Sequence, residues 1–116
     1  MDLVVRYLDH AGVPVLSLAG EVDLATVPSL RDALVRSAAE HPGATLAVDL
    51  DGVSFVDSMG LGVLVGGLRR FRRSGGDVVL VCSTPRLLDV LAECRLDRVF
   101  EIHSNLSSVA GATRRG

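Results

Sequence analysis

Aromatic residues are scarce in this 116-residue sequence, which contains no tryptophan, one tyrosine and three phenylalanines. Hydrophobic residues still make up 48% of the chain, so its core must be aliphatic, built from valine, leucine and alanine. Disordered chains combine few apolar residues with high net charge, whereas the formal net charge here is only -2. The composition therefore predicts one folded domain over residues 1–116, large enough to bury a core without disulfides or metal.

An excess of positive charge is also absent, since 12 basic residues stand against 14 acidic ones. Proteins that bind nucleic acid gain most of their affinity by neutralising phosphates, and those that hold single strands also stack bases on aromatic side chains. This chain offers neither a basic excess nor a set of aromatics. The composition therefore argues against a nucleic-acid partner.

Cysteine is rare, with only Cys82 and Cys94 in the chain. Neither belongs to a Cys-x-x-Cys pair, and no cysteines and histidines have the spacing of a zinc site. Both lie in apolar stretches, so we expect both thiols to be buried. The acids Asp49, Asp51 and Asp57 match no cation-binding loop, and the sequence thus predicts no metal and no cofactor.

No apolar run is long enough to cross a bilayer, which takes about 20 residues. The most apolar segment extends from Met59 to Leu68, and two arginines follow it. The start of the chain lacks the basic and then apolar layout of a signal peptide. We therefore expect a cytoplasmic protein without membrane contact.

The spacing of apolar residues predicts five strands and four helices. The strands are expected at 3–8, 13–19, 46–50, 78–81 and 99–102. The helices are expected from Thr26, as a cap, to before His41, from Ser58 to before Ser74, from Thr84 through Leu91, and over 104–112. Asp51-Gly52 is expected to end the third strand, with 53–56 as a connector.

The order β-β-α-β-α-β-α-β-α predicts an α/β fold, a small mixed sheet with a parallel centre and an N-terminal hairpin. Right-handed crossovers that step in one direction place every helix on the same side of a sheet. We therefore expect the helices to be packed on one face, with the other face only partly covered.

The segment from Asp57 to Gly62 is the most informative one, because it lies at a strand-to-helix junction. The backbone N–H groups at a helix start are unpaired and the dipole end is positive, so a phosphate on Ser58 would be well tolerated there. The alternative is that Ser58 is simply the helix N-cap. Local chemistry leaves both interpretations open.

Four glycines, Gly60, Gly62, Gly66 and Gly67, lie in the same helix, and each costs about 1 kcal/mol relative to alanine. They fall mainly outside the predicted core stripe, where Gly66 shares a face with Met59 and Val63. One interpretation is a shallow surface that another protein approaches closely. The other is close packing of the helix on its own sheet, and spacing does not separate the two.

The sequence does not contain a complete copy of the enzyme motifs that its glycines and Ser58 partly match. A dinucleotide fingerprint that begins at Gly60 would need glycine where Val65 stands, no lysine follows the glycines as in a P-loop, and Ser58 lacks the preceding glycine of a nucleophile elbow. No local motif marks a histidine as a base for Ser58; the histidines are His10, His41 and His103. We therefore expect no enzymatic activity.

Three stretches resemble the STAS domain of bacterial anti-sigma-factor antagonists. They are Gly20 to Thr26 before the first helix, Val48 to Gly62, and Gly75 to Val81 followed by Pro85 and a leucine-rich helix. In order and spacing they cover nearly the whole chain, from Leu3 to about Ala112. The family usually has Ser or Thr after the serine of the second stretch, whereas Met59 stands here.

The resemblance implies that Ser58 is a phosphoacceptor for an anti-sigma factor that is itself a serine kinase. The unphosphorylated protein would bind that factor and free the sigma factor, and a metal-dependent serine phosphatase would reset the switch. The expected partner surface has Asp23 and Asp57 at its rim and Met59, Gly60, Val63 and Gly66 near its centre, on a monomer or weak dimer. The alternatives are a non-switching scaffold or a nucleotide-sensing module in a larger signalling or transport complex.

Overall fold

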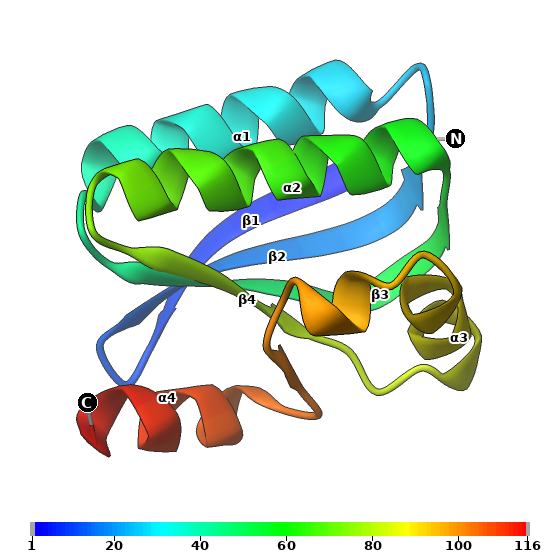
Figure 1. Cartoon of the computed structure of the whole chain (residues 1–116). Helices are drawn as coiled ribbons and strands as arrows, with labels where there is room; N and C mark the ends of the chain where they lie inside the picture. Colours follow the sequence, from blue (N-terminus) through cyan, green and yellow to red (C-terminus); the bar gives the residue numbers. More distant parts are fainter. Residues whose placement is uncertain (1, 116) are drawn as a thin grey trace.

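The computed structural model describes residues 2–115 (Figure 1). The elements follow the predicted order, with one additional 3-10 turn, η1, before the last strand. They are β1 (Leu3–His10), β2 (Val13–Val22), α1 (Val27–Glu40), β3 (Thr45–Val56), α2 (Ser58–Arg73), β4 (Asp77–Val81), α3 (Pro85–Glu93), η1 (Leu96–Arg98), β5 (Ile102–His103) and α4 (Leu106–Arg115).

The strands form a single sheet in the order β1-β2-β3-β4-β5. β1 and β2 are antiparallel and joined by a tight hairpin, in which Ala11 and Gly12 have φ angles of 52° and 87° and the Asp9 carboxylate accepts a hydrogen bond from the Gly12 N–H at 3.0 Å. All other neighbours are parallel. The predicted mixed sheet with a parallel centre and an N-terminal hairpin is therefore confirmed.

The main core lies between the sheet and helices α1, α2 and α3, and it is mainly aliphatic as predicted, with Phe71 and Phe100 as its two aromatic residues. Apolar residues at helical spacing form the helix side of this core. In α1 they are Val27, Leu30 and Leu34. In α2 they are Leu61, Leu64, Leu68 and Phe71. Inward residues of β2, β3 and β4 complete this core. The sheet residues concerned are Leu16, Leu18, Val22, Leu46, Val48, Leu50, Val53, Val78 and Leu80.

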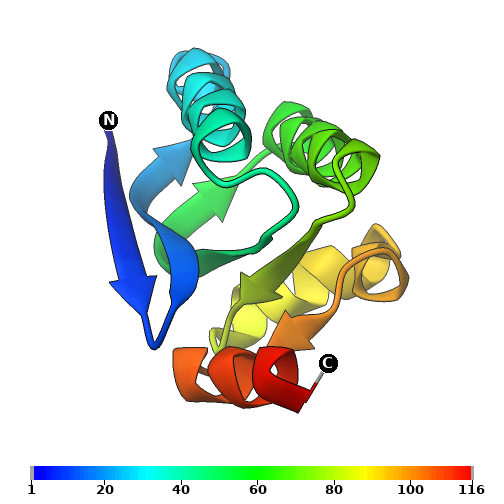
Figure 2. The same ribbon diagram turned by 90° about the vertical axis from the view of Figure 1, so that its left-hand side faces the viewer.

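Helix α4 lies on the opposite face of the sheet, which departs from the expectation that every helix shares one face (Figure 2). A second, smaller core of Val13, Val15, Ala47, Val79, Val81, Leu106, Val109 and Ala110 holds it there. The crossover rule constrains only helices that connect two parallel strands. Since α4 follows the last strand, it is free to fold back and cover the other side.

Strand β3 is longer than predicted, because Asp51-Gly52 does not end it. The pairing of β2 with β3 shifts register at two places and then continues to Val22 opposite Val56. A Cβ on Gly52 would lie 2.8 Å from the Leu18 carbonyl oxygen, so this glycine permits close approach of the neighbouring strand. Asp-Gly marks an irregularity within a strand here rather than a turn.

The last strand and one cysteine also differ from expectation. Strand β5 begins at Ile102 rather than at residue 99, because η1 precedes it and Phe100 is buried in the main core. Cys82 is buried as expected, whereas Cys94 is exposed at the end of α3. None of the helices within residues 2–115 has the length and hydrophobicity that crossing a bilayer requires.

Candidate functional site

The junction between β3 and α2 is built around Asp57. Its backbone is extended, with φ -94° and ψ 177°, and its carboxylate accepts a hydrogen bond from the Gly60 N–H at 2.9 Å. Asp57 is therefore the N-cap of α2, and Ser58 is the first helical residue. The alternative that Ser58 caps the helix is wrong, because the Asp57 carboxylate, and not the Ser58 hydroxyl, accepts the hydrogen bond from the Gly60 N–H.

Ser58 is exposed, and its hydroxyl makes no hydrogen bond to any residue in 2–115. It stands where the first-turn N–H groups of a helix lack intrahelical partners and the dipole is positive. No acidic residue lies in the first turn of α2, although the Asp57 carboxylate adjoins it. The hydroxyl is thus accessible and free, at a position that stabilises added negative charge.

The loop before α1 is held by hydrogen bonds beside this junction. The Asp23 carboxylate accepts hydrogen bonds from the N–H groups of Ala25 and Thr26 at 3.0 and 3.1 Å. The buried Thr26 hydroxyl donates to the Glu21 carbonyl at 2.8 Å and makes no capping bond to α1, so the expected cap is not formed. The Asp57 N–H donates to the Val22 carbonyl at 3.1 Å, which brings the two loops to the same end of the sheet.

Three large apolar side chains are exposed around this end of the sheet. Leu24 is 69% exposed, Phe55 49% and Met59 48%, and they come from three different segments. Sequence reasoning identified Met59 but missed Leu24 and Phe55. Both lie within the stretches that resemble the STAS family. The sequence predicted 53–56 as a connector, so the exposure of Phe55 could not be inferred before β3 was known to extend to Val56.

Two of the four α2 glycines serve internal packing. A Cβ on Gly60 would collide with Val22 Cγ1 and lie 2.9 Å from Val56 Cγ2, and one on Gly67 would lie 2.9 Å from Leu34 Cδ1. Both residues are buried. Gly60 therefore lies beneath the surface of α2, and its predicted part in a partner contact stays a prediction.

The other two glycines have no such internal reason. A Cβ on Gly62 or on Gly66 would meet no atom within 4 Å, and both residues are exposed. Each still costs about 1 kcal/mol of helix propensity. Close packing therefore explains Gly60 and Gly67 but not Gly62 and Gly66, and Gly66 lies with Met59 and Val63 on one surface as predicted.

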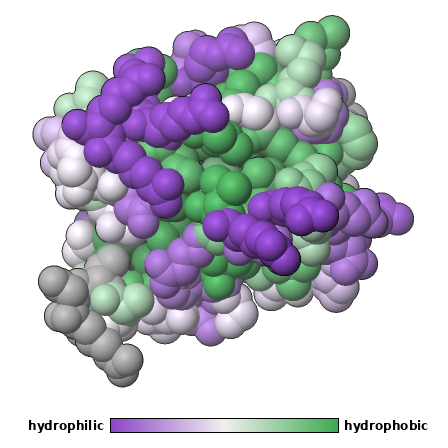
Figure 3. Space-filling model, in the orientation of Figure 1, coloured by the Kyte–Doolittle hydropathy of each residue, from purple (hydrophilic) through white to green (hydrophobic). Residues whose placement is uncertain are grey.

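Met59, Val63 and Gly66 line a shallow groove of about 430 Å³ between α1 and α2. The other lining residues are Arg31, Leu34, Val35, Gly62, Gly67 and Arg70. Figure 3 shows hydrophilic groups over the C-terminal halves of α1 and α2, and hydrophobic surface in the middle of the view, below α2. Sequence reasoning missed the α1 side of the groove, since nothing in the spacing indicates which helices are neighbours.

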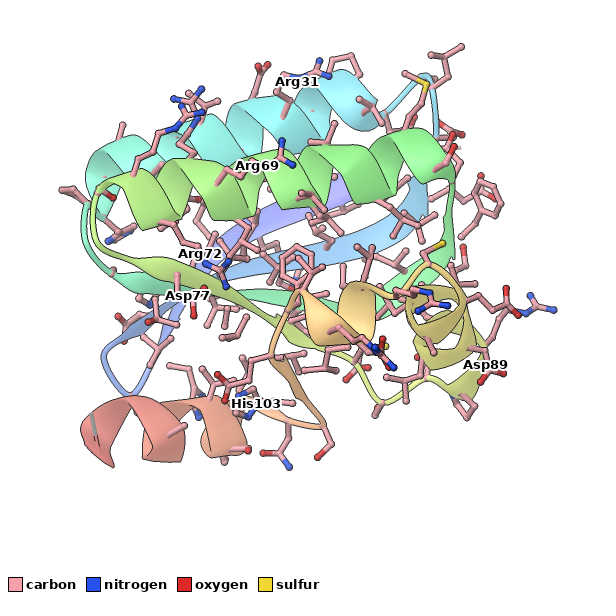
Figure 4. All side chains as sticks on the ribbon, in the orientation of Figure 1. Arg31, Arg69, Arg72, Asp77, Asp89 and His103 are labelled. Atoms are coloured by element: carbon pink, nitrogen blue, oxygen red, sulfur yellow. The ribbon has the colours of Figure 1, made fainter. Side chains whose placement is uncertain are left out.

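No histidine or carboxylate within residues 2–115 is hydrogen-bonded to the Ser58 hydroxyl. His103 interacts instead with Glu101 at 2.9 Å and with Ser108 at 2.7 Å, next to α4 on the other side of the sheet (Figure 4). This part of the chain also contains no cluster of three or more His, Cys, Asp or Glu that could bind a metal.

The model of the STAS domain family matches residues 5–109 of the chain. The chain belongs to the STAS family. This STAS domain is 34% identical to the anti-sigma-F factor antagonist RsfB of Mycobacterium tuberculosis over 117 residues, which cover 99% of this chain and 93% of the relative. It is 36% identical to the anti-sigma-B factor antagonist of Bacillus subtilis over 87 residues, 75% of this chain and 78% of the relative.

A solved structure supports the same assignment. The crystal structure of an anti-sigma factor antagonist from Mycobacterium paratuberculosis matches this STAS domain with a TM-score of 0.79 at 31% identity, over 97% of this chain and 94% of that chain. The predicted family and its fold are therefore confirmed, and the similarity includes the segment that contains Ser58.

Proposed function

We propose that this STAS domain is an anti-sigma-factor antagonist whose state is set by phosphorylation of Ser58. The names of the relatives support the first part of this proposal. The observation that carries the second part is the position of Ser58 at the first residue of α2, next to the cap formed by Asp57. Its hydroxyl is exposed and has no hydrogen-bond partner among the residues that the structure describes.

The proposed kinase is the anti-sigma factor itself. A hydroxyl held by the backbone of a helix start can be aligned for in-line attack on a γ-phosphoryl group. The described residues offer Ser58 no base, so the partner supplies the nucleotide site and the base. The unphosphorylated domain binds this factor and thereby frees the sigma factor, and a metal-dependent serine phosphatase removes the phosphate again.

The proposed contact surface surrounds Ser58. Asp23 and Asp57 stand at its rim, and the groove residues Met59, Val63 and Gly66 extend it along α2. The exposed Leu24 and Phe55 enlarge its apolar part. Such a surface suits a partner that covers Ser58 and excludes water from it.

Phosphorylation would weaken this contact by adding about -1.5 to -2 charges to it. The helix N-terminus offsets part of the charge within the free domain, but an apolar interface must desolvate the phosphate, which is costly unless it is paired. The Asp57 carboxylate makes the local field more negative. A loss of about 3 kcal/mol would weaken binding more than a hundredfold.

The test is incubation with each anti-sigma kinase of the host and ATP, followed by intact-mass measurement and phosphopeptide mapping. One phosphoryl group is expected on the wild type and none on Ser58→Ala. Ser54→Ala and Ser83→Ala are matched controls, because their hydroxyls are exposed but hydrogen-bonded to the Gly20 carbonyl at 3.3 Å and to Asp51 at 3.1 Å. Phosphate on either of these serines would refute the assignment.

Phosphorylation and binding measurements together separate the alternatives. A non-switching scaffold would bind its partner without accepting phosphate. A nucleotide-sensing module would bind ATP or GTP as a pure protein, which equilibrium dialysis measures directly. In a switching antagonist, Ser58→Asp binds the anti-sigma factor weakly and Ser58→Ala binds it persistently.

A further inference from the structure

The groove between α1 and α2 extends well beyond Ser58. It begins at Met59 and continues to Arg70 along α2, a length of about 16 Å at the helical rise per residue. The α1 side contributes Arg31, Leu34 and Val35. A groove of this length accommodates about three turns of another helix.

The centre of the groove is apolar and unfilled. Val35 is 40% exposed and Met59 48%, so both apolar side chains are open to a ligand. Gly62 and Gly66 contribute no side chain, and the space above them is empty to at least 4 Å from a Cβ position. The groove therefore leaves apolar surface exposed between two helices that are otherwise closely packed.

The charged residues of the groove are both cations. Arg31 and Arg70 line it, and no acidic residue does. Neither arginine makes an ion pair or a side-chain hydrogen bond with the part of the chain between residues 2 and 115.

Two arginines on the same two helices are already occupied. Arg36 pairs with Glu40 at 2.8 Å and lies over the Tyr7 ring, 4.5 Å from its centroid. Arg72 pairs with Asp77 at 3.4 Å (Figure 4). The local positive charge of the groove thus comes from guanidinium groups that are free to bind carboxylates.

We propose that this groove binds an amphipathic helix of the anti-sigma factor, with apolar residues in its centre and acidic residues paired to Arg31 and Arg70. A groove between two packed helices suits a third helix, whose ridges fit between theirs. Arginine pairs with carboxylates through two parallel hydrogen bonds. The inference rests on the proposed function. The groove opens beside Ser58, so the anti-sigma factor that covers Ser58 would place a second segment in the groove.

The first arm of the test fills the groove. Gly66→Leu is expected to weaken binding of the full-length anti-sigma factor at least tenfold in calorimetry, without lowering the thermal midpoint of the free domain. Gly111→Leu is the matched control, because Gly111 is an exposed helical glycine in α4 with equally open space. Its affinity should stay within twofold of the wild type.

The second arm reverses the charge. The double variant Arg31→Glu/Arg70→Glu is expected to lose at least tenfold in affinity, whereas Arg6→Glu on the exposed edge strand β1 stays within twofold. Surface acids of the anti-sigma factor are then changed singly to arginine. Rescue of the double variant by positions spaced three, four or seven residues apart on one helix supports the proposal.

The outcomes separate the two hypotheses. If the wild type binds, Ser58→Asp does not, and both groove variants bind like the wild type, the groove proposal is overturned while the switch stands. The proposal that the groove binds a helix is also overturned if the double variant is rescued by changing acidic residues in a loop or strand of the anti-sigma factor. If the wild type binds no anti-sigma factor of the host, the proposed function fails and the groove proposal falls with it.

Discussion

The carboxylate of Asp57 accepts a hydrogen bond from the Gly60 N–H at 2.9 Å, and the neighbouring Ser58 hydroxyl has no partner among the described residues. Two adjacent residues thus have separate physical tasks. Asp57 stabilises the start of α2, while Ser58 contributes no bond to the fold and remains open to chemistry.

Asp57→Ala is expected to lower the free energy of unfolding by about 1 kcal/mol, since it removes the cap. Ser58→Ala should change it by less than about 0.5 kcal/mol, as is usual at exposed positions without special contacts. Urea unfolding followed by circular dichroism measures both. Asp57→Asn is the control, because its side chain can still accept the bond. The assignment is wrong if Ser58→Ala costs more stability than Asp57→Ala.

A negative charge at Ser58 is expected to leave the fold intact. Ser58→Asp places that charge at the positive end of the α2 dipole, next to the Asp57 carboxylate, so the two effects oppose each other. Its free energy of unfolding should stay within about 1 kcal/mol of the wild type, with unchanged circular dichroism. A Ser58→Asp variant that unfolds would show that loss of partner binding reflects loss of structure.

The buried and open glycines of α2 should respond in opposite directions to alanine. Gly60→Ala should destabilise the domain by about 1–3 kcal/mol, because the new methyl group overlaps Val22 and Val56. Gly62→Ala should stabilise it by up to about 1 kcal/mol, because the methyl group enters open space and improves helix propensity. Thermal unfolding gives both signs, and equal effects would contradict the packing described for α2.

The two thiols should differ in reactivity. Burial raises the pKa of the Cys82 thiol, so at a given pH less of the reactive thiolate is present, and the sulfur is also shielded from solvent. Cys94 is exposed. Iodoacetamide at pH 8 should therefore modify Cys94 first, as read by intact mass and peptide mapping. In denaturant the two should react at similar rates, and prior modification of Cys82 in the native protein would contradict its burial.

Helix α4 should contribute to stability through the second face of the sheet. Val109 is 1% exposed in the smaller core, so Val109→Ala should cost about 1.5–3 kcal/mol. Ser107→Ala, on the exposed side of the same helix, should change stability by less than about 0.5 kcal/mol. Denaturant unfolding checks the pair. Equal values would indicate that α4 does not pack as described.

Much of the architecture follows from local patterns along the chain. The alternation of apolar residues at the start of β1 and their helical spacing in α1 and α2 are short-range properties, and they indicate which segments form strands and helices. The same holds for the family resemblance around Asp57 to Gly62. Short-range patterns also place Ser58 at a helix start, since the strand ends and the helix begins within a few residues.

Contacts between distant segments decided the remainder. A glycine in a helix can permit close packing or can face open space, and which of these applies depends on the residues opposite it. Val22 lies against Gly60, whereas a Cβ on Gly66 would meet no atom within 4 Å, and both facts are properties of the folded chain. The groove requires α1 and α2 to lie side by side, and α4 crosses to the other face because no following strand constrains it. Leu24 in the loop before α1 comes to the same end of the sheet as Phe55 and Met59 only when β2 and β3 pair side by side, which spacing along a single chain does not encode.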